Sequence, residues 1–267
     1  MYENILIPTD GSDAATTAAR YGLFLAERTG ATAHVLSVVD PDRYGTDIVG
    51  DVDDLVRRQQ SRLHDRAHGV VDEVAALAPV PVETHVVEGR PRRVLATAIR
   101  ERDIDLVAMG THGRSGVDRY LLGSLAEHTL RTAGVPVLVT RDGDVDEPEL
   151  ADIVVATDGS EGAERAGEHG IAVATATGAR LHTLTVDDDD TPARRLADRA
   201  RDVGIEATAT ARTGRPHEAI VAYADTVEAD LVVLGTHGRT GVERVLLGSV
   251  AERTVRTAPV PTMVVGP

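Results

Sequence analysis

The stretch GTHGRSGVDRYLLGSLAEHTLRT, residues 110–132, is repeated almost unchanged as GTHGRTGVERVLLGSVAERTVRT, residues 235–257. The two copies agree at 17 of 23 positions, and their glycines keep the same spacing. Repetition of this kind indicates that the chain contains two copies of one structural unit. Any function of this stretch is therefore expected twice in the chain.

The repeat extends to both sides of this stretch. Residues 4–12, NILIPTDGS, match residues 152–160, DIVVATDGS, at an offset of 148, whereas Gly89 in EGRPRRVL matches Gly214 at an offset of 125. The second copy therefore lacks 23 residues between its second and third strands. This pattern predicts a first domain over residues 1–141, a polar linker over 142–150 and a shortened second domain over 151–267.

Each copy alternates short β-branched runs with stretches of helical periodicity. In the first copy, strands are expected near residues 3–8, 33–39, 82–87, 104–109 and 136–140. Strands that alternate with helices form βαβ units, so the pattern predicts an α/β fold whose parallel sheet is covered on both faces. Ligands of such folds bind beyond the carboxyl ends of the strands. The segments PTDGS, SVVD and MGTHG lie at predicted strand ends, so we expect them to meet in one crevice.

The charge balance argues against nucleic acid as a partner. The chain has 43 acidic and 28 basic residues, a net charge of −15, and every basic residue is an arginine. So acidic a chain repels phosphate backbones, and an aromatic content of 2% leaves few platforms for base stacking. The acidic, lysine-free composition favours a cytoplasm of high salt, where charge repulsion is screened. The alternative is an ordinary acidic protein from a GC-rich genome.

Other features of the composition concern location and chemistry. The absence of cysteine excludes disulfides and thiolate metal sites. No apolar run approaches the length of a membrane span, and the first residues, MYENILIPTDGS, lack the pattern of a signal peptide. We therefore expect a cytoplasmic protein without a membrane partner.

The repeated stretch has the features of a phosphate-binding loop. Gly110 and Gly113 follow a predicted strand, where glycine allows the backbone to approach a ligand closely, and Gly123-Ser124 opens a predicted helix. The amides at a helix N-terminus attract anions, so the arrangement suits a polyphosphate. The competing interpretation is structural, because Ser124-x-x-Glu127 and Ser249-x-x-Glu252 read as capping boxes. A Walker A loop is excluded by the lack of lysine, and the dinucleotide pattern G-x-G-x-x-G is absent.

The pattern Gly110-x2-Gly113-x9-Gly123-Ser124, together with Asp10 at the end of the first strand, resembles the ATP-binding branch of the universal stress protein family. The resemblance covers nearly the whole chain as two fused copies. It implies two tandem, open-twisted, five-stranded parallel-sheet sandwiches of the Rossmann-like, adenine nucleotide-binding type, with strand order 3-2-1-4-5. It also implies that the fifth strands pair across a pseudo-twofold axis, which would make the chain an intramolecular pseudo-dimer able to form a further homodimer.

The resemblance implies a set of nucleotide-binding residues in each copy. Asp10 and its neighbours would contact adenine and ribose, Val38 would meet adenine through its backbone, and the glycine-rich segments would hold ribose and phosphates. In the first copy the set is Pro8, Thr9, Asp10, Val38, Met109, Gly110, His112, Gly113, Arg114, Gly123, Ser124 and Leu125. In the second copy it is Ala156, Thr157, Asp158, Val186, Leu234, Gly235, His237, Gly238, Arg239, Gly248, Ser249 and Val250.

The second copy departs from this pattern in three ways. Ala156 replaces the proline found at residue 8, the acidic run Asp187–Asp190 follows Val186 directly, and the 23-residue deletion removes part of the wall over the adenine pocket. The charge of the acidic run would weaken ATP binding and the deletion opens the pocket, so the first site is expected to be the tighter. Because ATP phosphates add negative charge to an acidic protein, we expect Mg²⁺ to accompany them.

Several other polar residues have simpler interpretations. His112 and His237 in the predicted loops are better read as hydrogen-bonding groups than as acid–base catalysts. His64 and His68 have the i, i+4 spacing of a metal pair, but charged neighbours favour a solvated helix face. Arg114 and Arg239 are candidates for the counter-charge that lysine would otherwise supply, with a surface role as the alternative.

Two classes of function fit these observations. The first is a nucleotide-binding regulatory protein that senses ATP in a stress response and acts on a protein partner, with little or no hydrolysis. The second is a slow ATPase or a nucleotide-dependent transferase, and a scaffold without ligand is a weaker third. No paired carboxylates, nucleophile elbow or metal-ligand cluster accompanies the glycine-rich segments in the sequence. We therefore assign no catalytic residue and no metal ligand, which favours binding over turnover.

Overall fold

The computed structural model describes residues 2–41, 52–111, 122–141, 143, 147–236 and 247–266, with the side chains of residues 52–57 excepted. Its strands form one ten-stranded sheet in the order β3-β2-β1-β4-β5-β10-β9-β6-β7-β8. The strands are β1 (Asn4–Pro8), β2 (Thr32–Val39), β3 (Val82–Glu88), β4 (Leu106–Gly110), β5 (Val137–Thr140), β6 (Asp152–Ala156), β7 (Arg180–Val186), β8 (Ala207–Arg212), β9 (Leu231–Gly235) and β10 (Thr262–Val265).

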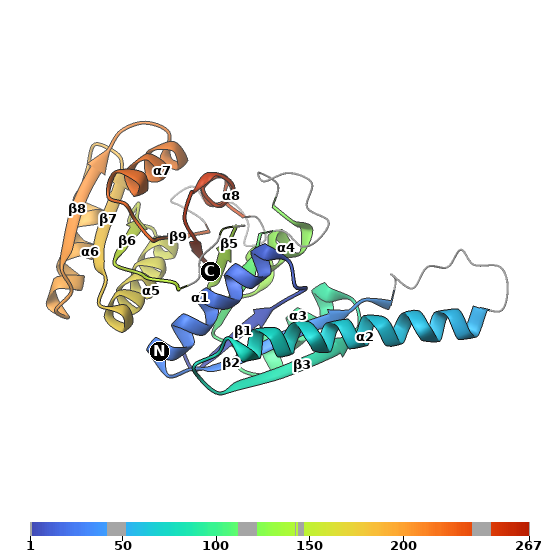
Figure 1. The fold of residues 1–267 in the computed structure, drawn as a ribbon. Helices are drawn as coiled ribbons and strands as arrows, with labels where there is room; N and C mark the ends of the chain where they lie inside the picture. Colours follow the sequence, from blue (N-terminus) through green and yellow to red (C-terminus); the bar gives the residue numbers. More distant parts are fainter. Residues whose placement is uncertain are drawn as a thin grey trace.

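Helices cover both faces of this sheet (Figure 1). One face packs against α1 (Asp13–Thr29), α2 (Val52–Ala76), α5 (Glu161–Thr177) and α6 (Thr191–Asp202). The other face packs against α3 (Pro91–Glu101), α4 (Ser124–Thr132), α7 (Pro216–Thr226) and α8 (Ser249–Thr257). The apolar side chains of the central strands are almost fully buried between these two layers, as expected for a parallel sheet.

The α/β fold and the strand order predicted from the sequence are confirmed. Each half has its strands in the order 3-2-1-4-5, and the described neighbours within each half all run parallel. The two fifth strands, β5 and β10, pair antiparallel, with Met263 opposite Leu138. The two sheets therefore join edge to edge into one, so the halves share a continuous sheet.

The length difference between the halves lies in the crossover from the second strand to the third. In the first half this crossover contains α2, with 25 residues, whereas the matching α6 has only 12. Figure 1 shows α2 lying along β2 and β3 and extending away from the rest of the chain. The helix that covers the second and third strands is therefore shorter in the second half.

The repeated sequence produces the same local structure in both halves. Helix α1 begins after Ser12, whose hydroxyl accepts a hydrogen bond from the Ala15 amide, and ends at Gly30, which adopts a φ of 73°. Helix α5 begins after Ser160 in the same way and ends at Gly178, with a φ of 78°. A serine cap and a left-handed glycine define the two ends of each helix.

The outermost strands differ in character from the central ones. Strands β1 and β4 are buried along most of their length, whereas β3 and β8 consist mainly of exposed and half-buried residues. Polar side chains on such edges discourage pairing with other chains. Among the described helices, none combines the length and the apolar character required to cross a bilayer.

Candidate functional site

The carboxyl ends of three neighbouring strands meet at one edge of the first half. Strand β1 lies between β2 and β4, with Pro8 opposite Leu36 and Leu6 opposite Val107. Asp10 follows β1 by two residues, and Val38 and Gly110 lie at the carboxyl ends of β2 and β4, so all three lie at this edge. In the second half, Asp158 follows β6, and Val186 and Gly235 end β7 and β9 in the same way. The structure thus brings these predicted residues together in both halves.

A tight turn holds Asp10 at this edge. Its Oδ1 atom accepts a hydrogen bond from the Ser12 amide at 3.0 Å, and the Thr9 hydroxyl accepts one from the Gly11 amide at 3.3 Å. Gly11 adopts a φ of 72°, a left-handed conformation that glycine adopts without strain. In the second half, Asp158 accepts from Ser160 at the same distance of 3.0 Å. Each aspartate is therefore fixed at the start of the first helix of its half.

Gly110 and Gly235 have a structural reason to be glycine. A Cβ atom on Gly110 would lie 2.7 Å from the carbonyl carbon of Ala14, and one on Gly235 would lie 2.8 Å from that of Gly162. Helices α1 and α5 pack so closely on β4 and β9 that no side chain fits between them. The close approach predicted for these glycines is therefore made by the protein itself, with no ligand required.

Gly123 and Gly248 differ in this respect. Their φ angles are −63° and −60°, with ψ angles of 147° and 144°, an extended conformation that any residue can adopt. The Gly123 amide donates to the Thr111 carbonyl at 2.7 Å, which fixes the start of α4 beside the end of β4. The Gly248 amide donates to Thr236 at 2.9 Å in the same way. The N-termini of α4 and α8 therefore lie at the carboxyl edge, where their first amides lack partners within the helix.

The capping-box interpretation of this segment is wrong. Gly123 and Gly248 are the N-cap residues, and Ser124 and Ser249 are the first residues inside the helices. Glu127, which a capping box would turn back towards the helix start, instead pairs with Arg131 at 2.7 Å. Both serines are exposed, and their hydroxyls are not in the position that caps a helix.

The other predicted nucleotide-binding residues lie around the same edge. Pro8 and Thr9 are buried at the end of β1, and Met109 and Leu234 are buried at the ends of β4 and β9. Leu125 and Val250 are half-buried in the first turns of α4 and α8. Ala156 ends β6, and Thr157 follows it as a buried residue. Six predicted residues lie outside the described part of the chain: His112, Gly113, Arg114, His237, Gly238 and Arg239.

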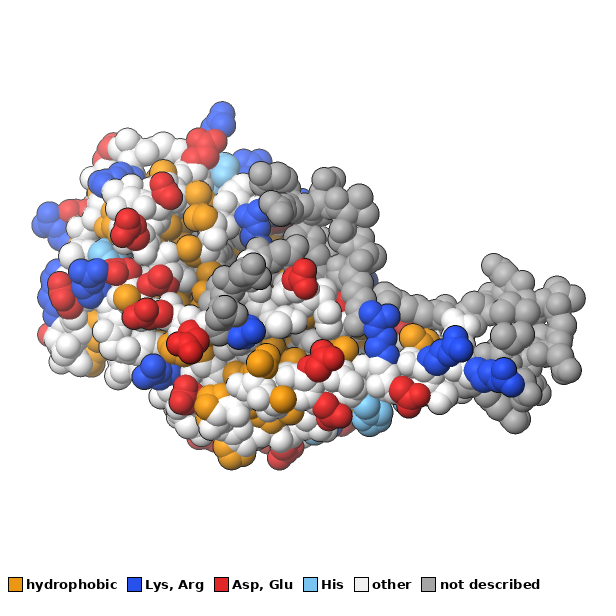
Figure 2. All heavy atoms as spheres, viewed as in Figure 1, with side chains coloured by type: hydrophobic (Ala, Val, Ile, Leu, Met, Phe, Trp, Pro, Cys, Tyr) orange, Lys and Arg blue, Asp and Glu red, His pale blue; other side chains and the backbone are white. Residues whose placement is uncertain are grey.

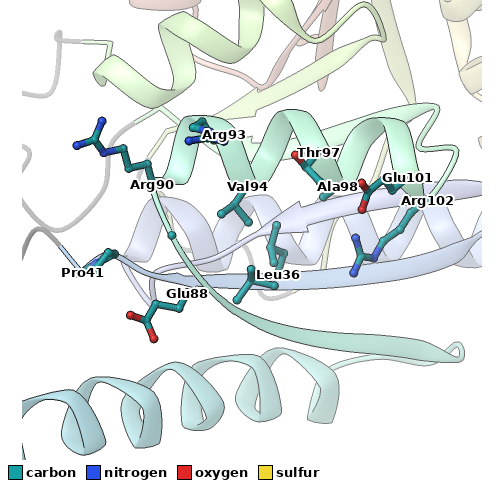
Figure 3. A pocket seen from close by; sticks show the side chains of 12 residues that line it. Leu36, Pro41, Glu88, Arg90, Arg93, Val94, Thr97, Ala98, Glu101 and Arg102 are labelled. Atoms are coloured by element: carbon teal, nitrogen blue, oxygen red, sulfur yellow. The ribbon is translucent and has the colours of Figure 1, made fainter. Parts of the chain in front are cut away.

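A cavity of about 480 Å³ adjoins this edge in the first half. It lies between α3 and the strands β2 and β3, and Figure 3 shows Val94 and Leu36 pointing towards each other across it. Arg90 and Arg93 lie at one end of the cavity, with Glu101 and Arg102 at the other. None of the predicted nucleotide-binding residues that the structure describes lines it, but Leu36 lies on the same face of β2 as Val38, two residues away.

Arg90 and Arg93 are not among the residues predicted to bind nucleotide. The only sequence signal was the repeated Gly-Arg-Pro that opens α3 and α7, which was used to align the copies. A neighbouring arginine, Arg92, donates to the Ser124 carbonyl at 3.3 Å and so ties α3 to the first turn of α4. The N-termini of both helices therefore face the same region.

The acidic run of the second half has a local structural role. Asp189 accepts from the Thr191 amide at 2.9 Å, and Asp190 is the N-cap residue of α6 and pairs with Arg194 at 2.7 Å. Carboxylates are favourable at a helix N-terminus. In the first half, His64 lies 3.5 Å from Glu88 and His68 is exposed, which agrees with a solvated helix face.

Comparison with known proteins gives a consistent result. The family model described as "Universal stress protein family" matches residues 1–141, 150–199 and 190–266. A universal stress protein of Mycolicibacterium smegmatis is 30% identical over 221 residues, covering 74% of this chain and 73% of that protein. The crystal structure of a universal stress protein from Archaeoglobus fulgidus has a TM-score of 0.75 at 26% identity, covering 98% of this chain and 96% of that one. A universal stress protein crystallised in complex with cAMP is 31% identical and covers 44% of this chain and 98% of its own, with a TM-score of 0.39.

Proposed function

Because the chain belongs to the universal stress protein family, we propose that it is a regulatory nucleotide sensor of the stress response that binds ATP at the carboxyl edge of each half. The proposal is carried by the glycines that open α4 and α8. Their extended backbone does not require glycine, yet both halves have glycine there, at the carboxyl edge where each half also has an aspartate fixed in a turn. A ligand that approaches the helix N-terminus closely accounts for this choice, and a phosphate group is such a ligand.

The surroundings of the first site suit a nucleotide. The cavity between α3, β2 and β3 is within the size range of small-molecule sites, with Leu36 and Val94 facing each other across it and Arg90 and Arg93 at one end. We expect adenine and ribose to lie near Asp10 and Val38 and the phosphates near Gly123 and Ser124. Because the protein carries a net charge of −15, we expect Mg²⁺ to accompany the phosphates.

The pairing of β5 with β10 supports a second part of the proposal. Antiparallel pairing of equivalent strands is the arrangement that a twofold axis produces between identical subunits. We propose that the two halves form an intramolecular pseudo-dimer with one nucleotide site in each half.

Calorimetric titration with Mg·ATP tests the sites. We expect two sites in the wild-type chain, with the N-terminal one tighter, because the second half carries Ala156 in place of proline and Asp187 directly after Val186. Gly123→Val should weaken the first site at least tenfold and leave the second intact, and Gly248→Val should do the reverse, because a side chain blocks the close approach of phosphate.

Gly143→Val is the matched control. Nothing lies within 4 Å of a Cβ atom on Gly143, so the same substitution there should leave both sites unchanged. If Gly123→Val and Gly248→Val kept full affinity at both sites, the helix N-termini would not hold the phosphates and the proposal would fail.

We expect ATP to be bound far better than it is hydrolysed. Backbone amides and helix dipoles bind the ground state and the transition state about equally, which raises affinity more than rate. Steady-state phosphate release at saturating Mg·ATP should be at least ~100-fold below the median enzyme rate of about 10 per second. Turnover in the ordinary range that the double variant Gly123→Val/Gly248→Val abolished would identify the protein as an ATPase instead.

A further inference from the structure

A cluster of three potential ligands lies at the amino-terminal ends of β2 and β3, away from the carboxyl edge. His34 on β2 is buried, and it lies opposite Glu83 and beside His85, both on β3. The Nδ1 atom of His34 is 3.4 Å from Nε2 of His85 and 3.4 Å from Oε2 of Glu83. Nε2 of His85 and Oε2 of Glu83 are 3.8 Å apart. Three atoms that can each coordinate a metal therefore converge on one point.

Hydrogen bonds fix which nitrogen of His34 carries the proton. The Asn4 side-chain amide donates from Nδ2 to the Asp103 carbonyl at 3.4 Å, which turns Oδ1 of Asn4 towards His34. That oxygen can only accept, so Nε2 of His34, 3.1 Å away, is the donor. In neutral His34 the lone pair of Nδ1 therefore faces His85 and Glu83. Metal-binding histidines are oriented in this way, with the second ring nitrogen bonded to a fixed oxygen.

The second half shows what this position looks like when the histidine is simply satisfied by hydrogen bonds. His182 replaces His34, and its Nε2 lies 2.7 Å from Asp152. Its Nδ1 lies 3.1 Å from the hydroxyl of Thr208, which can donate to it. Thr208 and Thr210 occupy the strand positions of Glu83 and His85. In the second half, the Thr208 hydroxyl can donate a hydrogen bond to Nδ1 of His182. In the first half, the residue at that position is Glu83, whose carboxylate cannot donate to Nδ1 of His34.

A divalent cation fits this arrangement when Nε2 of His85, like Nδ1 of His34, presents its lone pair. Zinc binds nitrogen and carboxylate oxygen at about 2.0–2.1 Å, so two ligands of a tetrahedral ion lie about 3.3 Å apart. The three observed separations of 3.4, 3.4 and 3.8 Å are close to that value. Two imidazole nitrogens and one carboxylate oxygen also match the ligand types that Zn²⁺ and its neighbours in the first transition row prefer.

We propose that His34, Glu83 and His85 form a binding site for a divalent transition metal, with Zn²⁺ as the ion that the ligand set fits best. Three protein ligands leave a fourth position, which water would fill. The site lies on the edge strand β3, at the opposite ends of the strands from the proposed nucleotide site, and it does not depend on nucleotide binding.

The charges around the cluster affect this site in two opposing ways. Burial lowers the pKa of His34 and of His85, and the nearby Arg102 lowers both further, while Glu83 raises them. A lowered pKa favours the neutral imidazole, which is the state that coordinates metal. The guanidinium of Arg102 also repels a cation, so we expect weaker binding than at a closed structural zinc site.

The test is zinc binding by the full chain, measured by equilibrium dialysis against Zn²⁺ followed by elemental analysis. We expect one zinc per wild-type chain. Glu83→Thr/His85→Thr should lower the zinc affinity at least tenfold, and it should fold because it copies the arrangement that the second half already uses. His64→Ala/His68→Ala is the matched control, since it removes the other histidine pair and should leave zinc binding unchanged.

The outcomes separate the alternatives. Loss of zinc in the threonine variant and its retention in the control would support the site, provided that both variants keep the wild-type circular dichroism spectrum. Zinc retained by the threonine variant would overturn the proposal. So would a wild-type chain that bound no zinc at micromolar concentration, which would leave the cluster held by a shared proton.

Discussion

At the scale of single residues, Asp152 is a carboxylate held by two cationic or polar side chains. It is buried, and its two oxygens accept from Nη2 of Arg180 at 2.6 Å and from Nε2 of His182 at 2.7 Å. Burial alone would raise the pKa of Asp152, but the hydrogen bonds and charges of Arg180 and His182 together outweigh it and lower the pKa. The fold therefore stabilises the ionised form, and Asp152 contributes stability while it is charged.

We predict that Asp152→Asn lowers the free energy of unfolding at pH 7 by about 1 kcal/mol, the difference between a charge-assisted and a neutral hydrogen bond. Because the folded pKa lies below the unfolded value of about 3.9, the contribution is complete above that value and is lost as pH falls through the folded pKa. The difference in unfolding free energy between the wild type and Asp152→Asn, measured with urea, should therefore be smaller at about pH 3 than at pH 7. Asp198→Asn, in an exposed pair with Arg201, should have no measurable effect. An equal difference at both pH values would contradict the role of the charge.

Some residue-level features could be predicted from the sequence and others could not. The positions of Asp10 and Val38 follow from their places just after or at the end of strands, because parallel strands end at one edge. The close packing of Gly110 against Ala14 depends on the depth at which a helix sits on the sheet, which spacing does not reveal. The pairing of His34 with Glu83 and His85 depends on the register between β2 and β3, set by residues nearly fifty positions apart.

At the scale of elements, the close contact between α1 and β4 leaves no room for a side chain at Gly110, the first residue of the repeated stretch. We predict that Gly110→Ala destabilises the fold by about 1–3 kcal/mol, because the new Cβ would lie 2.7 Å from backbone that cannot move without shifting α1. Gly235→Ala should behave alike through α5. Thermal or urea unfolding of both variants checks the prediction.

The control for these variants is Gly69→Ala in α2. Nothing lies within 4 Å of a Cβ atom at Gly69, so alanine there should stabilise the chain by up to about 1 kcal/mol through helix propensity. If Gly110→Ala were as harmless as Gly69→Ala, the packing explanation would be wrong and the case for a ligand at Gly110 would return.

The elements themselves were largely predictable. Runs of β-branched residues alternating with amphipathic stretches predicted the strands and helices, and the predicted strand limits of the first copy lie within two residues of those observed. The strand order followed from the family resemblance. The starts of α4 and α8 were harder, since Ser-x-x-Glu is a common capping signal. There the glycine that precedes the serine ends up as the cap, because its amide bonds to the strand end at Thr111 or Thr236.

At the scale of the whole molecule, the excess of negative charge is the main feature. Figure 2 shows acidic and arginine side chains interspersed on the face in view, so local pairs coexist with a net charge of −15. Salt weakens the repulsion between these charges, since the Debye length falls from about 30 Å at an ionic strength of 0.01 M to about 3 Å at 1 M. Stability should therefore depend on ionic strength.

We predict that the melting temperature rises by several degrees between dilute buffer and molar sodium chloride, with most of the rise at the lower concentrations where screening changes fastest. A differential scanning calorimetry series measures it. The same series in sodium sulfate is the control, because sulfate also stabilises proteins by exclusion from their surface. A flat or falling profile in chloride would contradict a chain adapted to high salt.

The seam between β5 and β10 also bears on how the two halves can change over time. When one gene encodes both partners of a symmetric assembly, every substitution appears in both, so neither partner can acquire a property that the other must lack. Here the partner is supplied on the same chain at a high effective concentration, and each half has its own codons. The halves are thereby free to specialise. One already has a long crossover helix and a histidine–glutamate cluster, and the other has a short helix and threonines in the same places. The pairing of β5 with β10 thus allows the two halves of one chain to acquire different functions while they remain associated.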